Sequence, residues 1–161
     1  MTVAHDVYSE TNPAFCAFVL AAFVDAYAVT KGRGPDLATA YVALPIALSG
    51  DLGPSFEGTN KKTGLAMWLQ RRPEVQIGLA DRLNQTLEIV TEAVRFSAFV
   101  EVVTVEADGR LKIGPAKLKA SAARALTDQP GQALKRAERL GYWFADAGST
   151  RTVFDTMGLT V

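Results

Sequence analysis

The chain has 161 residues, of which 48% are hydrophobic and 21% are charged, a composition typical of one soluble globular domain. Its 17 basic and 17 acidic residues give a formal net charge of zero, which argues against a protein built mainly to neutralise phosphates. The single Cys16 and the single His5 exclude an internal disulfide and a structural zinc site made from these two residue types.

The sequence also indicates a location. Its start lacks the basic region and long apolar stretch of a secretory signal. We count no apolar run of the roughly 18 residues that a membrane helix needs. We therefore expect a cytoplasmic protein without membrane contact, folded as a single domain over residues 1–161.

The first predicted helix begins after Asn12. The Asn12 side chain can cap free backbone amides, and Pro13 suits the first helical position. Apolar residues then recur at three- and four-residue steps until Gly32, where glycines and a proline end the helix. The expected inner stripe consists of Phe15, Phe18, Val19, Ala22, Phe23, Ala26 and Val29.

The next segments alternate between apolar and loop-like composition. Residues 37–48 are apolar on nearly every side, and Pro45 either kinks a buried helix or ends a short strand; the Ala and Leu content favours the helix. Residues 50–60 read as a loop, and residues 60–71 as a short helix. From Pro73 towards Val100 we expect one long amphipathic helix, with an inner stripe of Leu79, Leu83, Leu87, Val90 and Val94.

The pattern then changes to that of a β-hairpin at about residues 101–114, with its turn at Asp108-Gly109. An Ala-rich helix is expected over 117–126, and C-terminal helices over about 132–158, separated at Gly148. The fold class is therefore mainly α with one β-hairpin. The order of its elements resembles a winged-helix domain.

Catalytic and cofactor sites find little support in the sequence. Residues 58–64 have the glycines, lysines and threonines of a phosphate loop, but they lack its Gly-Lys-Ser/Thr step, so ATP binding is not expected. Cys16 lies near the inner face of the first helix, where a free cysteine usually packs as a small apolar residue. A Ser-His-Asp or Cys-His site would have to use His5, the single histidine. The carboxylates are spread along polar helix faces. We therefore predict no enzyme, no cofactor and no metal.

Basic residues cluster at Lys61-Lys62, at Arg71-Arg72, and in and after the hairpin. In a winged-helix domain the wing contacts phosphates, which makes Arg110, Lys112, Lys117 and Lys119 candidate nucleic-acid contacts. The alternative is an ordinary solvated charge pattern on a neutral protein. Because the helix before the hairpin is acidic over 88–95, sequence-specific DNA recognition is disfavoured, and weak backbone contact stays open.

Three aromatic residues stand together near the C-terminus. Tyr142, Trp143 and Phe144 point about 100° apart around a helix, so they cannot all face one core. One interpretation places Trp143 and Phe144 in the core with Leu140. The other makes Tyr142, Trp143 and the nearby Arg139 a partner interface, with Tyr142 as the best candidate for the outward ring.

Three stretches together resemble a known family. These are Thr11-Asn12-Pro13-Ala14-Phe15, then Tyr41-Val42-Ala43-Leu44-Pro45-Ile46-Ala47-Leu48, and finally Leu140-Gly141-Tyr142-Trp143-Phe144-Ala145 with the ending Met157-Gly158-Leu159. They resemble the opening, buried Leu-Pro and closing segments of the middle component of three-component ABC systems of bacterial conflict. The resemblance spans nearly the whole chain.

The resemblance implies a function that composition and periodicity do not show. It implies a component that couples an ABC ATPase of the SMC or Rad50 kind to an effector, in anti-phage defence related to Lamassu-type systems. We therefore expect a non-enzymatic adaptor, with the ATPase and the effector as its partners. The alternative from another class is a winged-helix DNA-binding transcriptional regulator that uses the region from Arg110 to Lys119.

Overall fold

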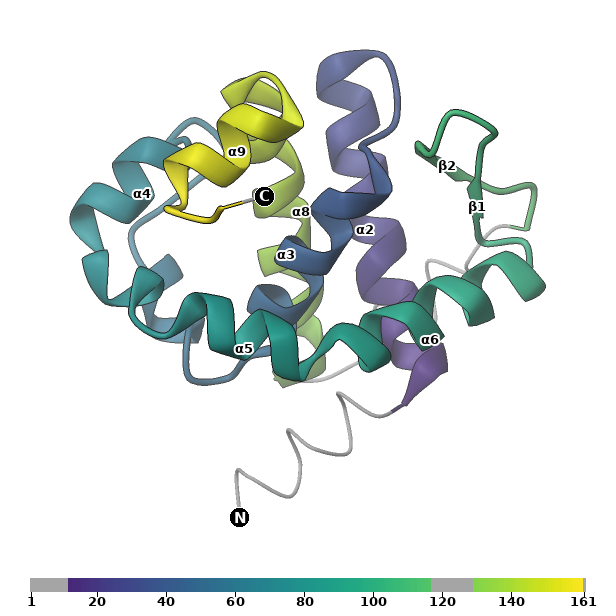
Figure 1. Ribbon diagram of the computed structural model, residues 1–161, viewed down its shortest axis with the longest axis horizontal. Helices are drawn as coiled ribbons and strands as arrows, with labels where there is room; N and C mark the ends of the chain where they lie inside the picture. Colours follow the sequence, from purple (N-terminus) through teal and green to yellow (C-terminus); the bar gives the residue numbers. More distant parts are fainter. Residues whose placement is uncertain (1–11, 117–128, 161) are drawn as a thin grey trace.

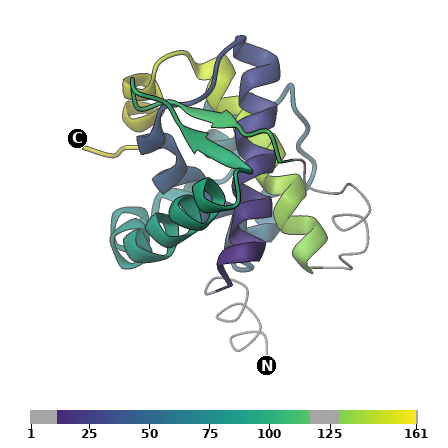
Figure 2. The same cartoon turned by 90° about the vertical axis from the view of Figure 1, so that its right-hand side faces the viewer.

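Two 19-residue helices form the centre of the computed structural model, which describes residues 12–116 and 129–160. α2 spans Pro13–Lys31 and α8 spans Gln129–Ala147, and the two run side by side in the same direction (Figures 1 and 2). The parallel direction is clear at their ends, because the Lys31 ammonium group donates to the Gly148 carbonyl oxygen over 3.4 Å. The first predicted helix thus pairs directly with the longer of the two C-terminal helices.

α2 begins and ends as the sequence predicts. The Asn12 side chain accepts hydrogen bonds from two backbone amides of the first turn, and Gly32 ends the helix in the left-handed conformation. The predicted inner stripe is only half right. Val19, Phe23 and Ala26 are buried, whereas Val29 is 73% exposed. The buried surface of α2 is displaced towards Cys16, Leu20, Val24 and Tyr27.

α2 corrects one sequence expectation about membranes. Its hydropathy averages 1.7 over 18 residues, so by length and composition alone it could span a bilayer. Half of that stretch is buried within the fold, and the core helix of a soluble protein passes the same test.

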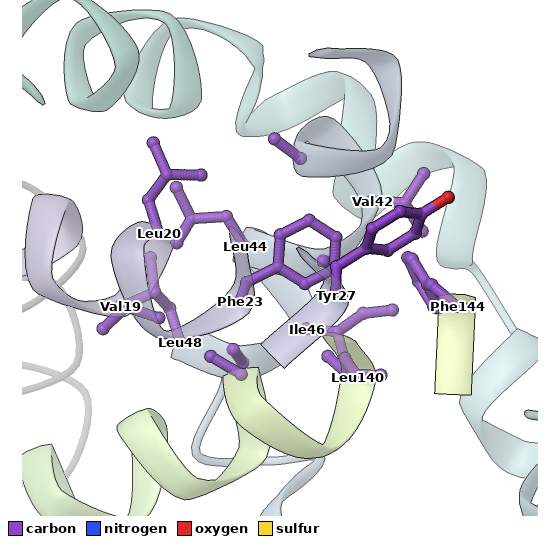
Figure 3. Close-up of a cluster of buried hydrophobic side chains, with 14 of the residues drawn as sticks. Val19, Leu20, Phe23, Tyr27, Val42, Leu44, Ile46, Leu48, Leu140 and Phe144 are labelled. Atoms are coloured by element: carbon purple, nitrogen blue, oxygen red, sulfur yellow. The ribbon is translucent and has the colours of Figure 1, made fainter. Parts of the chain in front are cut away.

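α3 spans Leu37–Leu48 and confirms the predicted buried helix, with Pro45 inside it. Figure 3 shows its side chains interleaved with those of α2 and α8 in one hydrophobic cluster. The cluster joins elements from both ends of the chain, and its labelled members include Leu20, Phe23, Val42, Leu44, Ile46, Leu140 and Phe144.

The segment after α3 contains short elements. A 3-10 turn covers Gly53–Phe56, α4 covers Leu65–Arg71, and a second 3-10 turn covers Pro73–Gln76. α4 is shorter than the helix predicted over 60–71, because residues 60–63 form a turn in which the Thr63 amide donates to the Asn60 carbonyl oxygen.

The single long helix predicted from Pro73 to Val100 is wrong. The structure has α5 over Leu79–Gln85 and α6 over Leu87–Phe99. Gly78 adopts a left-handed conformation, and the Thr86 hydroxyl bonds back to carbonyl oxygens of the preceding turn. The predicted inner stripe does not continue across the break at Thr86, since Leu79, Leu83 and Val90 are buried but Leu87 is 47% exposed.

The predicted hairpin is confirmed. β1 (Val103–Val105) pairs antiparallel with β2 (Leu111–Ile113) across a turn at Asp108-Gly109. The hairpin lies against α2, with the end of α6 beside it (Figure 2). The connection before α3 also pairs with β2, and a Cβ at Gly34 would lie only 1.6 Å from the Leu111 carbonyl oxygen.

The C-terminal helices are confirmed, since Gly148 ends α8 and Ser149 caps α9, which spans Thr150–Thr156. The helix expected over 117–126 lies outside the described residues. A mainly α fold with one hairpin is therefore correct, but the winged-helix arrangement is not confirmed. The centre of this fold is instead a parallel helix pair that joins the two ends of the chain.

Candidate partner-binding surface

The three consecutive aromatics of α8 face three different environments. Phe144 is fully buried and meets Phe23 of α2 edge to face, with ring centroids 5.6 Å apart. Trp143 is also fully buried, but on another side of α8, where it lies 5.2 Å from Trp68 and stacks on Phe56. Tyr142 is half-buried.

This placement corrects the expectation that Trp143 forms a partner interface. The prediction that three neighbouring rings on a helix cannot all face one core is confirmed. However, α8 is covered on two sides, by α2 on one and by α4 with the Gly53–Phe56 turn on the other. Two of the three rings therefore enter the core, and Tyr142 alone reaches the surface.

Trp143 and Arg139 hold the loop of residues 57–64 against α8. The Trp143 indole N–H donates to the Asn60 carbonyl oxygen over 2.9 Å, and the Arg139 guanidinium donates to the Thr59 hydroxyl over 3.0 Å. Within the loop, the Asn60 side chain accepts from the Lys62 amide. These bonds fix the loop in a defined position on α8.

The result is a small basic and aromatic surface, formed by Lys61, Lys62 and Tyr142. The Lys61 ammonium group lies 5.7 Å from the centre of the Tyr142 ring, within reach of a cation–π interaction. Lys62 beside it is exposed. Tyr142 and Arg139 were predicted, whereas their contact with this loop was not. No local sequence signal could have found it, because the two segments are far apart in the chain.

The candidate nucleic-acid residues do not form a concentrated positive surface among the described residues. The Arg110 guanidinium lies 3.6 Å from an Asp108 carboxylate oxygen and 3.8 Å from an Asp36 carboxylate oxygen. Lys112 is exposed, but two exposed glutamates lie nearby in the chain: Glu101 just before β1 and Glu106 just after it. Lys117 and Lys119 lie outside the described residues.

Arg110 instead has a structural role. Its partner Asp36 also accepts a hydrogen bond from the Thr150 hydroxyl, so one carboxylate joins the hairpin, the start of α3 and the start of α9. Nearby, burial raises the pKa of Tyr27; Asp36 raises it further, while Arg33 and Arg110 oppose the shift.

Other chemistry-bearing groups are dispersed. Cys16 is buried in α2, as its position predicted. No group of three or more His, Cys, Asp or Glu side chains within residues 12–116 and 129–160 could hold a metal ion. A groove of about 560 Å³ lies between α9 and the start of α3, where Ala38, Phe154 and Leu159 contribute apolar surface and Arg151 and Asp155 are charged.

The pKa of Glu138 on α8 is raised from its ordinary value of 4.5. The first cause is partial burial of the carboxyl group, although the residue as a whole is exposed, and the second is the Asp25 carboxylate on α2. Arg139 and Lys135 lower the pKa by smaller amounts. The Glu138 carboxyl group therefore binds a proton more tightly in the folded protein than in the unfolded chain.

We expect Glu138→Gln to stabilise the protein at pH 7 and to have no such effect below about pH 4. For a carboxyl group with a raised folded pKa, stability falls as the pH rises from the unfolded value through the folded value. The gain should stay below about 1 kcal/mol, because the side chain is partly solvated. Urea unfolding at both pH values measures it. The control Glu92→Gln, an exposed partner of Arg95, should show no gain at pH 7.

One comparison with known proteins agrees with the sequence resemblance. Residues 2–161 match the family described as ABC-three component (ABC-3C) system Middle Component 3. No curated protein and no solved structure matches the chain. The family match covers both ends and the described fold between them. The chain therefore belongs to the Middle Component 3 family of ABC-three component systems.

Proposed function

We propose that this chain is a non-enzymatic, cytoplasmic adaptor that links an SMC/Rad50-like ABC ATPase to an effector protein in an anti-phage defence complex. The observation that carries the proposal is the family match over residues 2–161. Because the match spans nearly the whole chain, the middle-component role belongs to this entire fold. A middle component of a three-component system has the other components as its partners.

The surface of Lys61, Lys62 and Tyr142 supports an adaptor role. An adaptor must present contact groups in a fixed geometry, because each side chain that is ordered only on binding costs affinity. The loop that carries both lysines is already held by Trp143 and Arg139. This surface therefore suits an acidic region on one of the two partners.

A three-way purification tests the proposal. The ATPase and the effector of the same gene cluster are produced with and without this chain, and one of them carries an affinity tag. We expect the two to co-purify only when the chain is present. Co-purification of ATPase and effector in its absence would contradict the adaptor role, as would a chain that binds neither of them.

Charge reversal in the loop tests the surface. Lys61→Glu together with Lys62→Glu should weaken binding of one partner at least tenfold without lowering the melting temperature, because both side chains are exposed. The matched control is Lys112→Glu together with Lys135→Glu, two exposed lysines on the hairpin and on α8, which changes the net charge by the same amount. Equal losses from the loop variant and the control would point to a general effect of net charge.

A further inference from the structure

Phe99 is unusually exposed for a phenylalanine in a protein with a large core. It is the last residue of α6, and 86% of its surface is accessible, the highest value among the large exposed hydrophobic residues of the described chain. Two other partly exposed apolar residues, Val105 and Ile113, lie on the hairpin that follows. An aromatic ring left in water on a folded surface is typical of a contact site.

The backbone beside Phe99 is strained. Glu101 has a φ of +61°, and within residues 12–116 and 129–160 it is the one residue other than glycine with a positive φ. Glycine or asparagine would adopt this conformation more easily. This left-handed residue ends α6, because the Val102 amide after it donates to the Ser97 carbonyl oxygen over 2.9 Å. The Glu101 side chain is exposed and forms no ion pair with the described residues.

The outer face of α6 leads to Phe99 and is acidic. Glu88, Glu92, Arg95 and Phe99 follow each other at steps of four, three and four residues, so they share one face of the helix. All four are exposed, and Arg95 is already paired with Glu92 over 2.9 Å. Figure 1 shows that α6 runs along the outer edge of the molecule and ends beside the hairpin. Phe99 thus ends a helix face that carries Glu88, and the exposed Glu101 follows it two residues later in the chain.

We propose that Phe99 inserts into an apolar pocket bordered by lysine or arginine side chains on a protein partner. This inference rests on the proposed adaptor function, since the partner is one of the other two components. The carboxylates of Glu88 and Glu101 disfavour nucleic acid and anionic lipid, which carry the same charge. A second copy of this chain fits less well as the partner. In the groove between α9 and the start of α3, the positive charge of Arg151 is neutralised by the Asp155 carboxylate 3.7 Å away.

The full chain, co-produced with the ATPase and the effector, provides the test. Phe99→Ser should weaken binding of one component at least tenfold, leave the other bound and leave the melting temperature unchanged. The matched control is Ile77→Ser, because Ile77 is 80% exposed and lies before α5. The double variant Glu88→Lys and Glu101→Lys should weaken the same component, and added salt should weaken its binding to the wild type.

Glu101→Gly separates a contact role from a structural one. Glycine relieves the positive φ, so the melting temperature should rise, while the loss of the carboxylate should weaken binding of the same component. The proposal is overturned if Phe99→Ser and Ile77→Ser bind both components equally well, and the adaptor role then still stands. It is also overturned if Phe99→Ser only abolishes self-association of the chain. If the wild-type chain binds neither component, both proposals fail.

Discussion

Replacing Trp143 with alanine is expected to lower the free energy of unfolding by roughly 3–5 kcal/mol, and the melting temperature by on the order of 10 °C. The indole is fully buried, stacks on Phe56 and contacts Trp68. Its N–H group also holds Asn60 of the 57–64 loop. Removal therefore leaves a cavity between α8 and α4 and releases the loop. Thermal unfolding followed by circular dichroism measures the effect.

Two variants serve as controls for Trp143→Ala. Trp143→Phe keeps an aromatic ring in the stack but loses the donor to Asn60, so its loss of stability should be smaller. Tyr142→Ala removes a half-buried ring from the neighbouring position and should also cost less. If Trp143→Ala kept its melting temperature and lost only partner binding, the core placement of Trp143 would be wrong and the interface interpretation would return.

Replacing Gly141 with alanine should destabilise the protein by about 1–3 kcal/mol, although alanine normally strengthens a helix. At Gly141 the backbones of α8 and α2 approach closely. A Cβ there would lie 2.6 Å from the Phe23 carbonyl oxygen and 2.8 Å from the Ala26 Cβ. The methyl group would have to push the two central helices apart. The urea midpoint of unfolding measures this change.

The sign of the Gly141→Ala effect is itself decisive. At an open helical position the substitution would add about 0.5–1 kcal/mol of stability. The matched control is Gly53→Ala in the first 3-10 turn, where a Cβ would meet only Arg136 at 3.5 Å, an ordinary contact distance. We expect little change there. A more stable Gly141→Ala variant would contradict the close approach of α2 and α8.

Local sequence signals identified those parts of the fold that depend on neighbouring residues. The Asn12-Pro13 start of α2, the Asp108-Gly109 turn of the hairpin and the break at Gly148 are all confirmed. Caps and turns have specific residue requirements that a single sequence displays. The Leu-Gly-Tyr-Trp-Phe segment also carried the family resemblance, and the family match confirms it.

Positions that depend on tertiary packing could not be predicted in the same way. α2 is apolar on most of its surface, so its periodicity could not show that Val29 faces solvent and Leu20 the core. The break at Thr86 has no proline or glycine of its own, and the apolar spacing of Leu83, Leu87 and Val90 runs through it. Each outcome depends on which neighbour covers the helix.

The C-terminal aromatic residues show most clearly what depends on the sequence alone and what depends on tertiary packing. By itself the sequence determined that residues 140–147 form a packed helix, that its three neighbouring rings must face different directions, and that the chain resembles a middle component. Only the tertiary structure decided where each ring goes. Because α2 covers one side of α8 and α4 another, Phe144 and Trp143 are both buried, and Tyr142 is left at the surface beside Lys61.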